Sequence, residues 1–520
     1  MREDNMADYT SRVPKYTFPD TLQEQEVALA TNPLMQRLIE SRKAYAGGAL
    51  RPIYHYVNPE GRLNDPNGLC SWHGRWHLFY QGYPPEDPRP HWGHAMSEDL
   101  IHWRDLPYCI YPNPEEKCYS GATLVEADRV IAIYHGVGVG NMVAVSSDPL
   151  LLNWKKVADK AVIPIKAPDG SDRPYRVFDP CIWRKGGTYY SLSAGTKPEG
   201  PAGKPVRADF LLRSEDLEHW EDVHFFVEDD RYTLVGDDGA CPYFWPIADR
   251  HILLFFSHMS GGQYLLGDYD TQRDKFVVTY GGKLNFGPAN PSGVHAPSAT
   301  PDGKGGVIVI FNMNPGKPTE GWDQIMTLPR RLTVRGDDLS IEPVADVESL
   351  REDPQRFEAI RLPANQEVVV DSLRGNAMEL IAEIDPKEVP MVEMNVLRSP
   401  GQEEHTRIAF FKNRGFADRG RGVGGRQSLI TIDSSYSSGA PDVRSRAPET
   451  APVFIEPDES LKLRVFVDRS VVEVFVNGKQ CVATRVYPTR EDSVGVSFRS
   501  QGADSQLRSL RAWRMKSIWA

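Results

Sequence analysis

The sequence lacks long hydrophobic runs, an excess of positive charge and any sign of a secretory leader. No stretch approaches the ~18 consecutive apolar residues of a membrane helix, and the first residues do not run from basic to apolar. The chain has 60 basic and 71 acidic side chains, so its net charge of −11 offers no positive field for phosphates. We therefore expect a cytoplasmic protein that binds a neutral small molecule and neither nucleic acid nor membrane.

Cysteine is also scarce, and its spacing is uninformative for metals. The six cysteines contain no CxxC pair, and the closest two, Cys109 and Cys118, are nine positions apart. This spacing indicates neither a zinc site nor a disulfide framework. We expect buried free thiols, no metal ion and no organic cofactor.

Helical patterns are almost confined to residues 1–50. Asn32 can cap a helix that begins with Pro33. The apolar face of this helix would consist of Leu34, Met35, Leu38 and Ile39. Because long helices are otherwise missing, parallel βαβ units have no support, and the rest of the chain is predicted to be all-β.

Residues 51–342 consist of short apolar or alternating runs that are typical of strands. The segment Ser97–Asp105 (Ser-Glu-Asp-Leu-Ile-His-Trp-Arg-Asp) recurs nearly intact at Ser214–Asp222, and a degraded third copy ends in Trp154. This period is close to that of a four-stranded propeller blade. About 290 residues at this period predict a five-bladed β-propeller, with a large β-sandwich as the alternative.

A second β-rich region follows a charged stretch at 343–364, which we interpret as a linker. Within residues 365–520, alternating runs flank Asn477-Gly478, the strongest short signal for a tight hairpin. This pattern indicates a C-terminal β-sandwich. The predicted order is therefore a short helical extension, a β-propeller, a linker and a β-sandwich.

Two Asp-Pro segments are candidate site positions. Asp65 lies in Asn-Asp-Pro-Asn-Gly and Asp179 in Phe-Asp-Pro, each directly before a predicted strand. The blades of a propeller direct the ends of their inner strands toward one axial funnel, where such carboxylates would converge. Each aspartate could instead form a structural Asx-turn, and both interpretations stay open.

With these segments the chain resembles glycoside hydrolase family 32, the β-fructofuranosidases, over about residues 50 to 515. The matching segments are His55–Gly68, Leu78–Gln81, Trp92–His94, Ser120–Thr123, Asp179-Pro180, Cys241-Pro242, Ala296-Pro297, Leu328–Arg331 and Leu463–Phe475. The resemblance implies a five-bladed propeller followed by a β-sandwich. It also implies a retaining hydrolase that cleaves a terminal β-fructofuranosyl unit, in sucrose or a short fructo-oligosaccharide, through a covalent fructosyl-enzyme.

The resemblance assigns roles to individual residues. Asp65 matches the family's nucleophile and Asp179 its transition-state stabiliser. The family lines its fructose pocket with polar groups over an aromatic floor. The matching positions are Asn64, Gln81, Trp92, Tyr119 and Ser120.

Two departures from the family pattern stand out. Phe178 replaces the arginine of the family's Arg-Asp-Pro motif, and either Arg176 substitutes for it or the pocket accepts a different sugar face. The family's acid/base is a glutamate directly before Cys-Pro, where this chain has Ala240. Alanine cannot donate a proton.

Three explanations of the alanine are open. The chain could be a deliberately inactivated variant of an active enzyme, or a natural protein that only binds fructosides. Alternatively Asp238, which in a strand points to the same face as position 240, could supply the acid. A fructosyltransferase is a further alternative, and the sequence is compatible with a homodimer.

Overall fold

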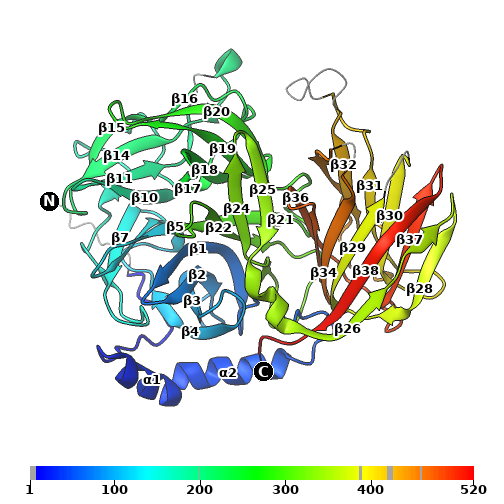
Figure 1. Ribbon diagram of the computed structural model, residues 1–520. Coiled ribbons are helices and arrows are strands. Elements are labelled where there is room, and N and C mark those ends of the chain that lie inside the picture. Colours follow the sequence, from blue (N-terminus) through cyan, green and yellow to red (C-terminus); the bar gives the residue numbers. More distant parts are fainter. Residues whose placement is uncertain (1–7, 198–199, 386–388, 418–425, 457–458, 520) are drawn as a thin grey trace.

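The computed structural model shows a helical segment and two β domains lying side by side (Figure 1). It describes residues 8–197, 200–385, 389–417, 426–456 and 459–519. Residues 1–7 of the expected N-terminal extension lie outside the described residues. Within the described residues, no helix combines the length and the apolar character needed to span a membrane.

Five mainly antiparallel sheets make up the first domain in the described part of the chain. The first contains β1 (Arg62–Trp72), β2 (Arg75–Tyr83), β3 (His91–Ser97) and β4 (Trp103–Ile110). The second contains β5 (Cys118–Val125), β6 (Val130–Gly136), β7 (Gly140–Ser146), β8 (Lys155–Lys156) and β9 (Ile163–Pro164). The third contains β10 (Pro180–Lys185), β11 (Thr188–Ser193), β14 (Phe210–Ser214) and β15 (Glu221–Phe225).

The last two sheets follow the same plan. The fourth contains β17 (Ala240–Ile247), β18 (Arg250–Ser257), β19 (Gly261–Asp270), β20 (Lys275–Lys283) and β16 (Val227–Glu228). The fifth contains β21 (Val294–Pro301), β22 (Val307–Met313), β24 (Arg330–Arg335), β25 (Asp338–Pro343) and β23 (Ile325–Met326). A separate small pair is formed by β12 (Thr196–Lys197) and β13 (Val206–Arg207).

The first strands of the five sheets form a closed inner ring. β1 contacts β5, β5 contacts β10, β10 contacts β17, β17 contacts β21, and β21 contacts β1 again. Each sheet then runs outward in a meander. This arrangement confirms the predicted five-bladed β-propeller.

The repeated tryptophan segment forms the turn between the third and fourth strands of a blade. Asp99 accepts hydrogen bonds from the backbone N–H groups two and three residues later, and Asp216 does the same in the second copy. The next residues, Leu100 and Leu217, have φ values of +69° and +72°. The repeat is therefore visible in the sequence because different blades make the same local turn.

Two antiparallel sheets form the second domain among the described residues. One contains β26 (Arg351–Phe357), β27 (Ile360–Leu362), β29 (Ala377–Asp385), β34 (Leu461–Asp468), β35 (Val471–Val476), β36 (Gln480–Arg485) and β38 (Ser505–Met515). The other contains β28 (Glu367–Arg374), β30 (Met391–Arg398), β31 (Thr406–Phe411), β32 (Ser428–Asp433), β33 (Glu449–Val453) and β37 (Gly495–Gln501). Leu380 and Val465 of the first sheet share one buried core with Met394 and Ile408 of the second, as expected for a β-sandwich.

The stretch 343–364 is not a free linker, in contrast to the prediction. After a short 3₁₀ turn (Ala345–Leu350), it supplies β26 and β27, both of which pair with β38. β26 has no fully buried residue, and its charged side chains belong to an edge strand. Charged edge strands resemble linkers in sequence because they carry no alternating apolar pattern.

Two helices, α1 (Leu22–Thr31) and α2 (Pro33–Tyr45), lie along one side of the propeller (Figure 1). Asn32 caps α2 as predicted, because its side chain accepts hydrogen bonds from the first backbone N–H groups. Leu34 and Leu38 are buried, whereas Ile39 is 41% exposed and does not belong to the apolar face. The buried stripe of the helix is narrower than the sequence pattern indicated.

A buried charged cluster joins the two domains. His55, which precedes the propeller, lies 2.9 Å from Asp468 through Nδ1 and 3.1 Å from Glu473 through Nε2. Arg330 of β24 pairs with Glu473 at 2.7 Å. Burial opposes the charge on His55, but the two carboxylates outweigh it and raise the pKa of His55 to about 9. The sandwich is thus held to the propeller by a compensated set of buried charges.

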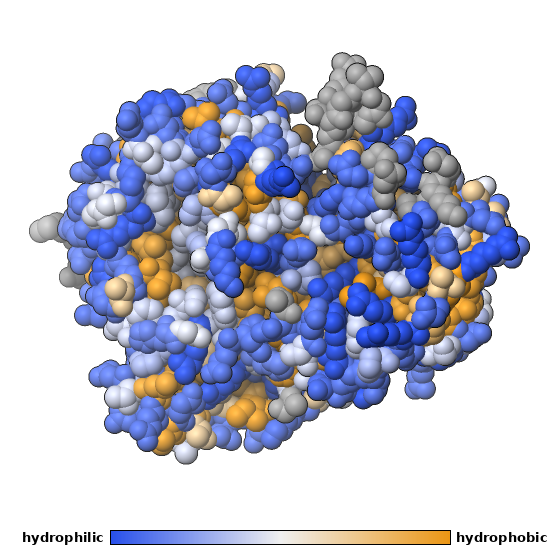
Figure 2. Space-filling model, in the orientation of Figure 1, coloured by the Kyte–Doolittle hydropathy of each residue, from blue (hydrophilic) through white to orange (hydrophobic). Residues whose placement is uncertain are grey.

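The surface of the molecule is mostly hydrophilic. Hydrophilic residues cover most of the face shown in Figure 2, and hydrophobic patches interrupt them. All six cysteines lie in the described part of the chain, and each is a buried free thiol, as expected.

Candidate active site

Each inner strand of the propeller brings one candidate residue to the same end of the axis. These residues are Asp65 in β1, Ser120 in β5, Asp179 directly before β10, Ala240 at the start of β17 and His295 in β21. They lie at or near the first residues of their strands. Their mutual contacts, described next, show that these strand starts meet although they are far apart in the sequence.

Asp65 is the centre of these contacts. Its Oδ2 accepts hydrogen bonds from Ser120 Oγ at 2.7 Å and from Gln81 Nε2 at 3.1 Å. Its Oδ1 lies 3.0 Å from Nδ1 of His295. All of these partners belong to other strands, so the Asp65 side chain is held by long-range contacts and not by an Asx-turn. Asp65 lies within a bulge of β1 between Leu63 and Pro66, and such bulges re-aim side chains.

The second carboxylate lies close to the first. Cys241 donates its backbone N–H to Oδ2 of Asp179 at 3.0 Å, and its Sγ lies 3.5 Å from that oxygen and 3.7 Å from Oδ2 of Asp65. Cys241 has a φ of +51°, within a bulge of β17 that aims the N–H at Asp179. Such an unfavourable backbone conformation is common at functional sites.

The two carboxyl groups have different pKa values because their environments differ. Burial raises the pKa of Asp65, but the charge of His295 and the hydrogen bonds from His295 and Ser120 outweigh it, so the pKa lies below the usual range. Burial and then the charge of Asp65 raise the pKa of Asp179 to about 7. Asp65 is therefore the charged carboxylate of the pair, and Asp179 titrates near neutrality.

An amide network extends from Asp65 to one wall of the site. Gln81 Oε1 accepts from Tyr83 OH at 3.1 Å and from Asn64 Nδ2 at 3.4 Å. Asn64 Oδ1 accepts from both Asn312 and Gln324 at 3.1 Å. Asn64, Gln81 and Ser120 thus come together around Asp65. Sequence reasoning missed the partners on the fifth blade, since they belong to no recognisable motif.

Trp92 does not form the expected aromatic floor. Its side chain is completely buried, and its ring packs 5.6 Å from those of Phe79 and Tyr134. The indole N–H donates to the backbone carbonyl of Tyr119 at 2.9 Å. Trp92 therefore holds the backbone at Tyr119 in place, and because its side chain is completely buried it cannot contact a ligand. The sequence motif identified this aromatic residue but not that its side chain lies in the core and not at the surface of the site.

Phe178 and Arg176 form a stacked pair at the edge of the site. The Arg176 guanidinium lies 4.0 Å from the centroid of the Phe178 ring, and Arg176 is exposed. The centroid of the Phe178 ring also lies 5.4 Å from that of the His135 ring. The centroid of the Tyr119 ring lies 6.4 Å from that of His135. The Arg176 guanidinium is thus stacked on the Phe178 ring.

Ala240 is surrounded by apolar side chains. It is 1% exposed and clusters with Cys241, Phe256 and Ala296, and Phe178 packs against this cluster. The alanine therefore fits its surroundings and does not face an open gap.

Asp238 is held by a histidine. Its Oδ2 lies 2.7 Å from Nδ1 of His258, and its Oδ1 accepts the backbone N–H of His258 at 3.2 Å. Both carboxylate oxygens are therefore used. His258 was not recognised from the sequence, and no motif in the chain marks it.

A hollow of about 800 Å³ opens beside Asp65. Residues of its lining include Asn64, Phe256, His258, His295 and Gln324. Asp65 itself is buried and does not line the hollow, but its neighbours Asn64 and His295 do, so the hollow adjoins the carboxylate. Concave sites with a few convergent polar groups are typical of small-molecule binding.

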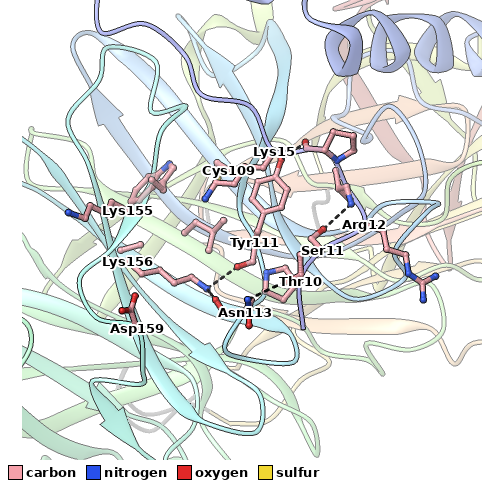
Figure 3. Close-up of a pocket in the computed structure, with 16 residues that line it drawn as sticks. Thr10, Ser11, Arg12, Lys15, Cys109, Tyr111, Asn113, Lys155, Lys156 and Asp159 are labelled. Atoms are coloured by element: carbon pink, nitrogen blue, oxygen red, sulfur yellow. Dashed lines mark hydrogen bonds between the residues drawn. The ribbon is translucent and has the colours of Figure 1, made fainter. Parts of the chain in front are cut away.

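A different hollow, of about 690 Å³, lies where the N-terminal segment meets β4 and β8 (Figure 3). Lys156 beside it donates to the backbone carbonyls of Tyr111 and Asn113 at 2.9 and 2.8 Å. Its amino group also contacts Glu115 at 2.5 Å. Protein groups thus already satisfy this cation, and none of the predicted site residues lines the hollow. We exclude it from the candidate site.

Comparison with known proteins agrees with this architecture. The chain is 25% identical over 505 residues to the sucrose-6-phosphate hydrolase of Zymomonas mobilis, which covers 89% of this chain and 92% of the relative. It is 25% identical over 511 residues to the levanase of Bacillus subtilis, covering 90% and 71%. The structure of fructan 1-exohydrolase IIa from Cichorium intybus matches with a TM-score of 0.77 at 21% identity, covering 90% of this chain and 98% of that chain.

Family models account for both domains. The Glycosyl hydrolases family 32 N-terminal domain matches residues 55–343, and the Glycosyl hydrolases family 32 C terminal matches residues 346–514. These matches confirm the resemblance seen in the sequence motifs. The chain belongs to glycosyl hydrolase family 32.

Proposed function

We propose that this protein hydrolyses terminal β-D-fructofuranosides, such as sucrose or short fructo-oligosaccharides, with retention of configuration. The observation that carries the proposal is the charged Asp65 carboxylate at the propeller axis, which Ser120 and Gln81 align and whose neighbours Asn64 and His295 line the hollow. Relatives whose names refer to sucrose 6-phosphate, levan and fructan support this substrate class.

The proposed reaction begins with attack of Asp65 on the anomeric carbon. The new bond joins an Asp65 oxygen to that carbon while its bond to the leaving-group oxygen breaks, and the leaving oxygen takes up a proton. Water then attacks the same carbon, releases fructose and restores the Asp65 carboxylate. Asp179, with its pKa raised to about 7, is suited to hydrogen-bond a sugar hydroxyl in either role, as donor or acceptor.

A second candidate function is fructoside binding without turnover. The buried Ala240 favours it, because alanine supplies no acid at the family's acid/base position. Transfer of the fructosyl unit to a sugar differs from hydrolysis only in the acceptor that resolves the intermediate.

A combined assay separates these functions. Purified protein is incubated with sucrose and with 1-kestose, products are separated by chromatography, and binding is measured by calorimetry. Release of fructose that the Asp65→Asn variant abolishes supports hydrolysis, whereas longer oligosaccharides support transfer. Binding without any product would favour the noncatalytic function and contradict the proposal.

The cytoplasmic location and the homodimer stay predictions. Cell fractionation of the source organism and light scattering of the purified protein test them directly.

A further inference from the structure

Without a glutamate at position 240, the proposed reaction lacks the group that protonates the leaving oxygen. The nucleophile and the leaving oxygen lie on opposite sides of the anomeric carbon. The acid therefore has to contact the substrate on the side that faces away from Asp65. Asp238 cannot act directly, because its oxygens are held by His258. His258 itself lines the hollow beside Asp65.

We propose that His258, oriented by Asp238, is the general acid and base of this enzyme in place of the family's glutamate. The inference rests on the proposed function. His258 would be a catalytic residue that touches the leaving oxygen, and Asp238 a positioning residue that acts through it.

The position of His258 fits this role. It follows β18, and Asp238 holds its Nδ1 at 2.7 Å, so Nε2 is the ring nitrogen left for a ligand. The His258 side chain is 58% exposed, so a substrate can reach it. Its ring centroid lies 6.3 Å from that of His295, whose Nδ1 is 3.0 Å from Asp65. A substrate atom bound in the hollow can therefore lie near both histidines.

The charges around His258 favour its protonated form. The hydrogen bond that His258 donates to Asp238 raises the pKa of His258 above its usual value, and the charges of Asp238, Asp179 and Asp65 add to this effect. His295 faces it from β21. Lys283 lines the same hollow and donates to a backbone carbonyl. An imidazolium whose Nδ1–H is held by a carboxylate presents its other N–H as a proton donor.

The proton balance then closes without another reagent. In the first step His258 gives its Nε2 proton to the leaving oxygen as Asp65 bonds to the anomeric carbon. In the second step neutral His258 takes a proton from the attacking water, and Asp65 leaves as a carboxylate. His258 ends protonated, as it began.

Two substrates that differ in their need for an acid test the proposal. Sucrose has an alcohol leaving group, whereas 4-nitrophenyl β-D-fructofuranoside has a phenolate that leaves without much help. We expect His258→Ala to lower kcat/KM on sucrose by about 10²–10⁴-fold and on the aryl fructoside by less than about tenfold. Asp238→Asn should move the alkaline limb of the pH–rate profile to lower pH, because it replaces the carboxylate that raises the pKa of His258 by a neutral amide.

The chain offers a matched control. His219 pairs with Asp216 in the same way, through Nδ1 at 2.8 Å and its backbone N–H at 2.8 Å, on a blade turn outside the site. His219→Ala should leave both substrates unchanged. Equal losses on both substrates in His258→Ala, or no loss on sucrose, would overturn the role of His258 while hydrolysis by the parent protein stands. A parent protein that cleaves neither substrate would overturn the proposed function and this role together.

Discussion

His295 Nδ1 lies 3.0 Å from Oδ1 of Asp65, so the fifth blade supplies a charge partner for the carboxylate of the first. Burial disfavours the charged form of Asp65, and His295 is the strongest influence against this effect. Replacing His295 by Ala should therefore raise the pKa of Asp65. Because attack requires the charged carboxylate, the acid limb of kcat/KM should move to higher pH in His295→Ala. An acid limb that stays in place would show that His295 does not set the charge of Asp65.

The two buried aspartates are coupled, which gives a second prediction. Burial, followed by the charge of Asp65, raises the pKa of Asp179 to about 7. Asp65→Asn removes this charge, so the pKa of Asp179 should fall while remaining above that of an exposed aspartate. Carboxyl titration by infrared or carbon-13 NMR difference spectroscopy measures the shift. An unchanged Asp179 titration in a folded Asp65→Asn protein would contradict the coupling.

Position 240 distinguishes an inactivated enzyme from one that uses another acid. If the alanine is an inactivating change, Ala240→Glu should raise sucrose hydrolysis by about 10²–10⁴-fold in the parent protein. If His258 is the acid, a comparable gain is expected only in the His258→Ala background. Rates of fructose release from the two single variants and the double variant decide between these outcomes, with thermal unfolding as the folding control.

The cluster of His55, Asp468 and Glu473 should make stability depend on pH. The pKa of His55 is about 9 in the folded protein and about 6.5 in the unfolded chain. Folding therefore favours protonated His55, and this contribution is complete below pH 6.5 and is lost as the pH rises through 9. His55→Gln should lower the free energy of unfolding at pH 6 by about 3–5 kcal/mol, because it leaves buried carboxylates without their partner.

Urea unfolding of both proteins between pH 6 and pH 10 measures this effect. The parent protein should lose stability across the window from 6.5 to 9, and His55→Gln should lose much less over the same range. Parallel pH profiles would assign the pH dependence to other groups.

Local sequence patterns determined much of the fold. The apolar runs at 76–80, 130–134, 189–192, 252–256 and 307–311 all lie in second strands of blades, where both neighbours in the sheet bury them. Asn32 and the Asn477-Gly478 hairpin were predicted for the same reason: capping and tight turns depend on a few adjacent residues. The tryptophan repeat revealed the blades because each copy makes its own turn.

The tertiary structure decided what meets at the axis. Asp65, His295 and Asp179 come from different blades, and their contacts arise only when the ring of inner strands closes. The sequence marked Trp92 as a site residue, but closure buries it beneath Tyr119.

The pairing of Asp238 with His258 was likewise decided by the tertiary structure and not by a sequence motif. Sequence motifs identified the family and the missing glutamate, because these features reside in consecutive residues. Which side chain faces the nucleophile depends on bulges, on strand register and on the closure of the propeller, and these are properties of the packed chain. The sequence alone therefore determined the architecture and the family, whereas only the tertiary structure placed His258 at the hollow that adjoins the candidate nucleophile.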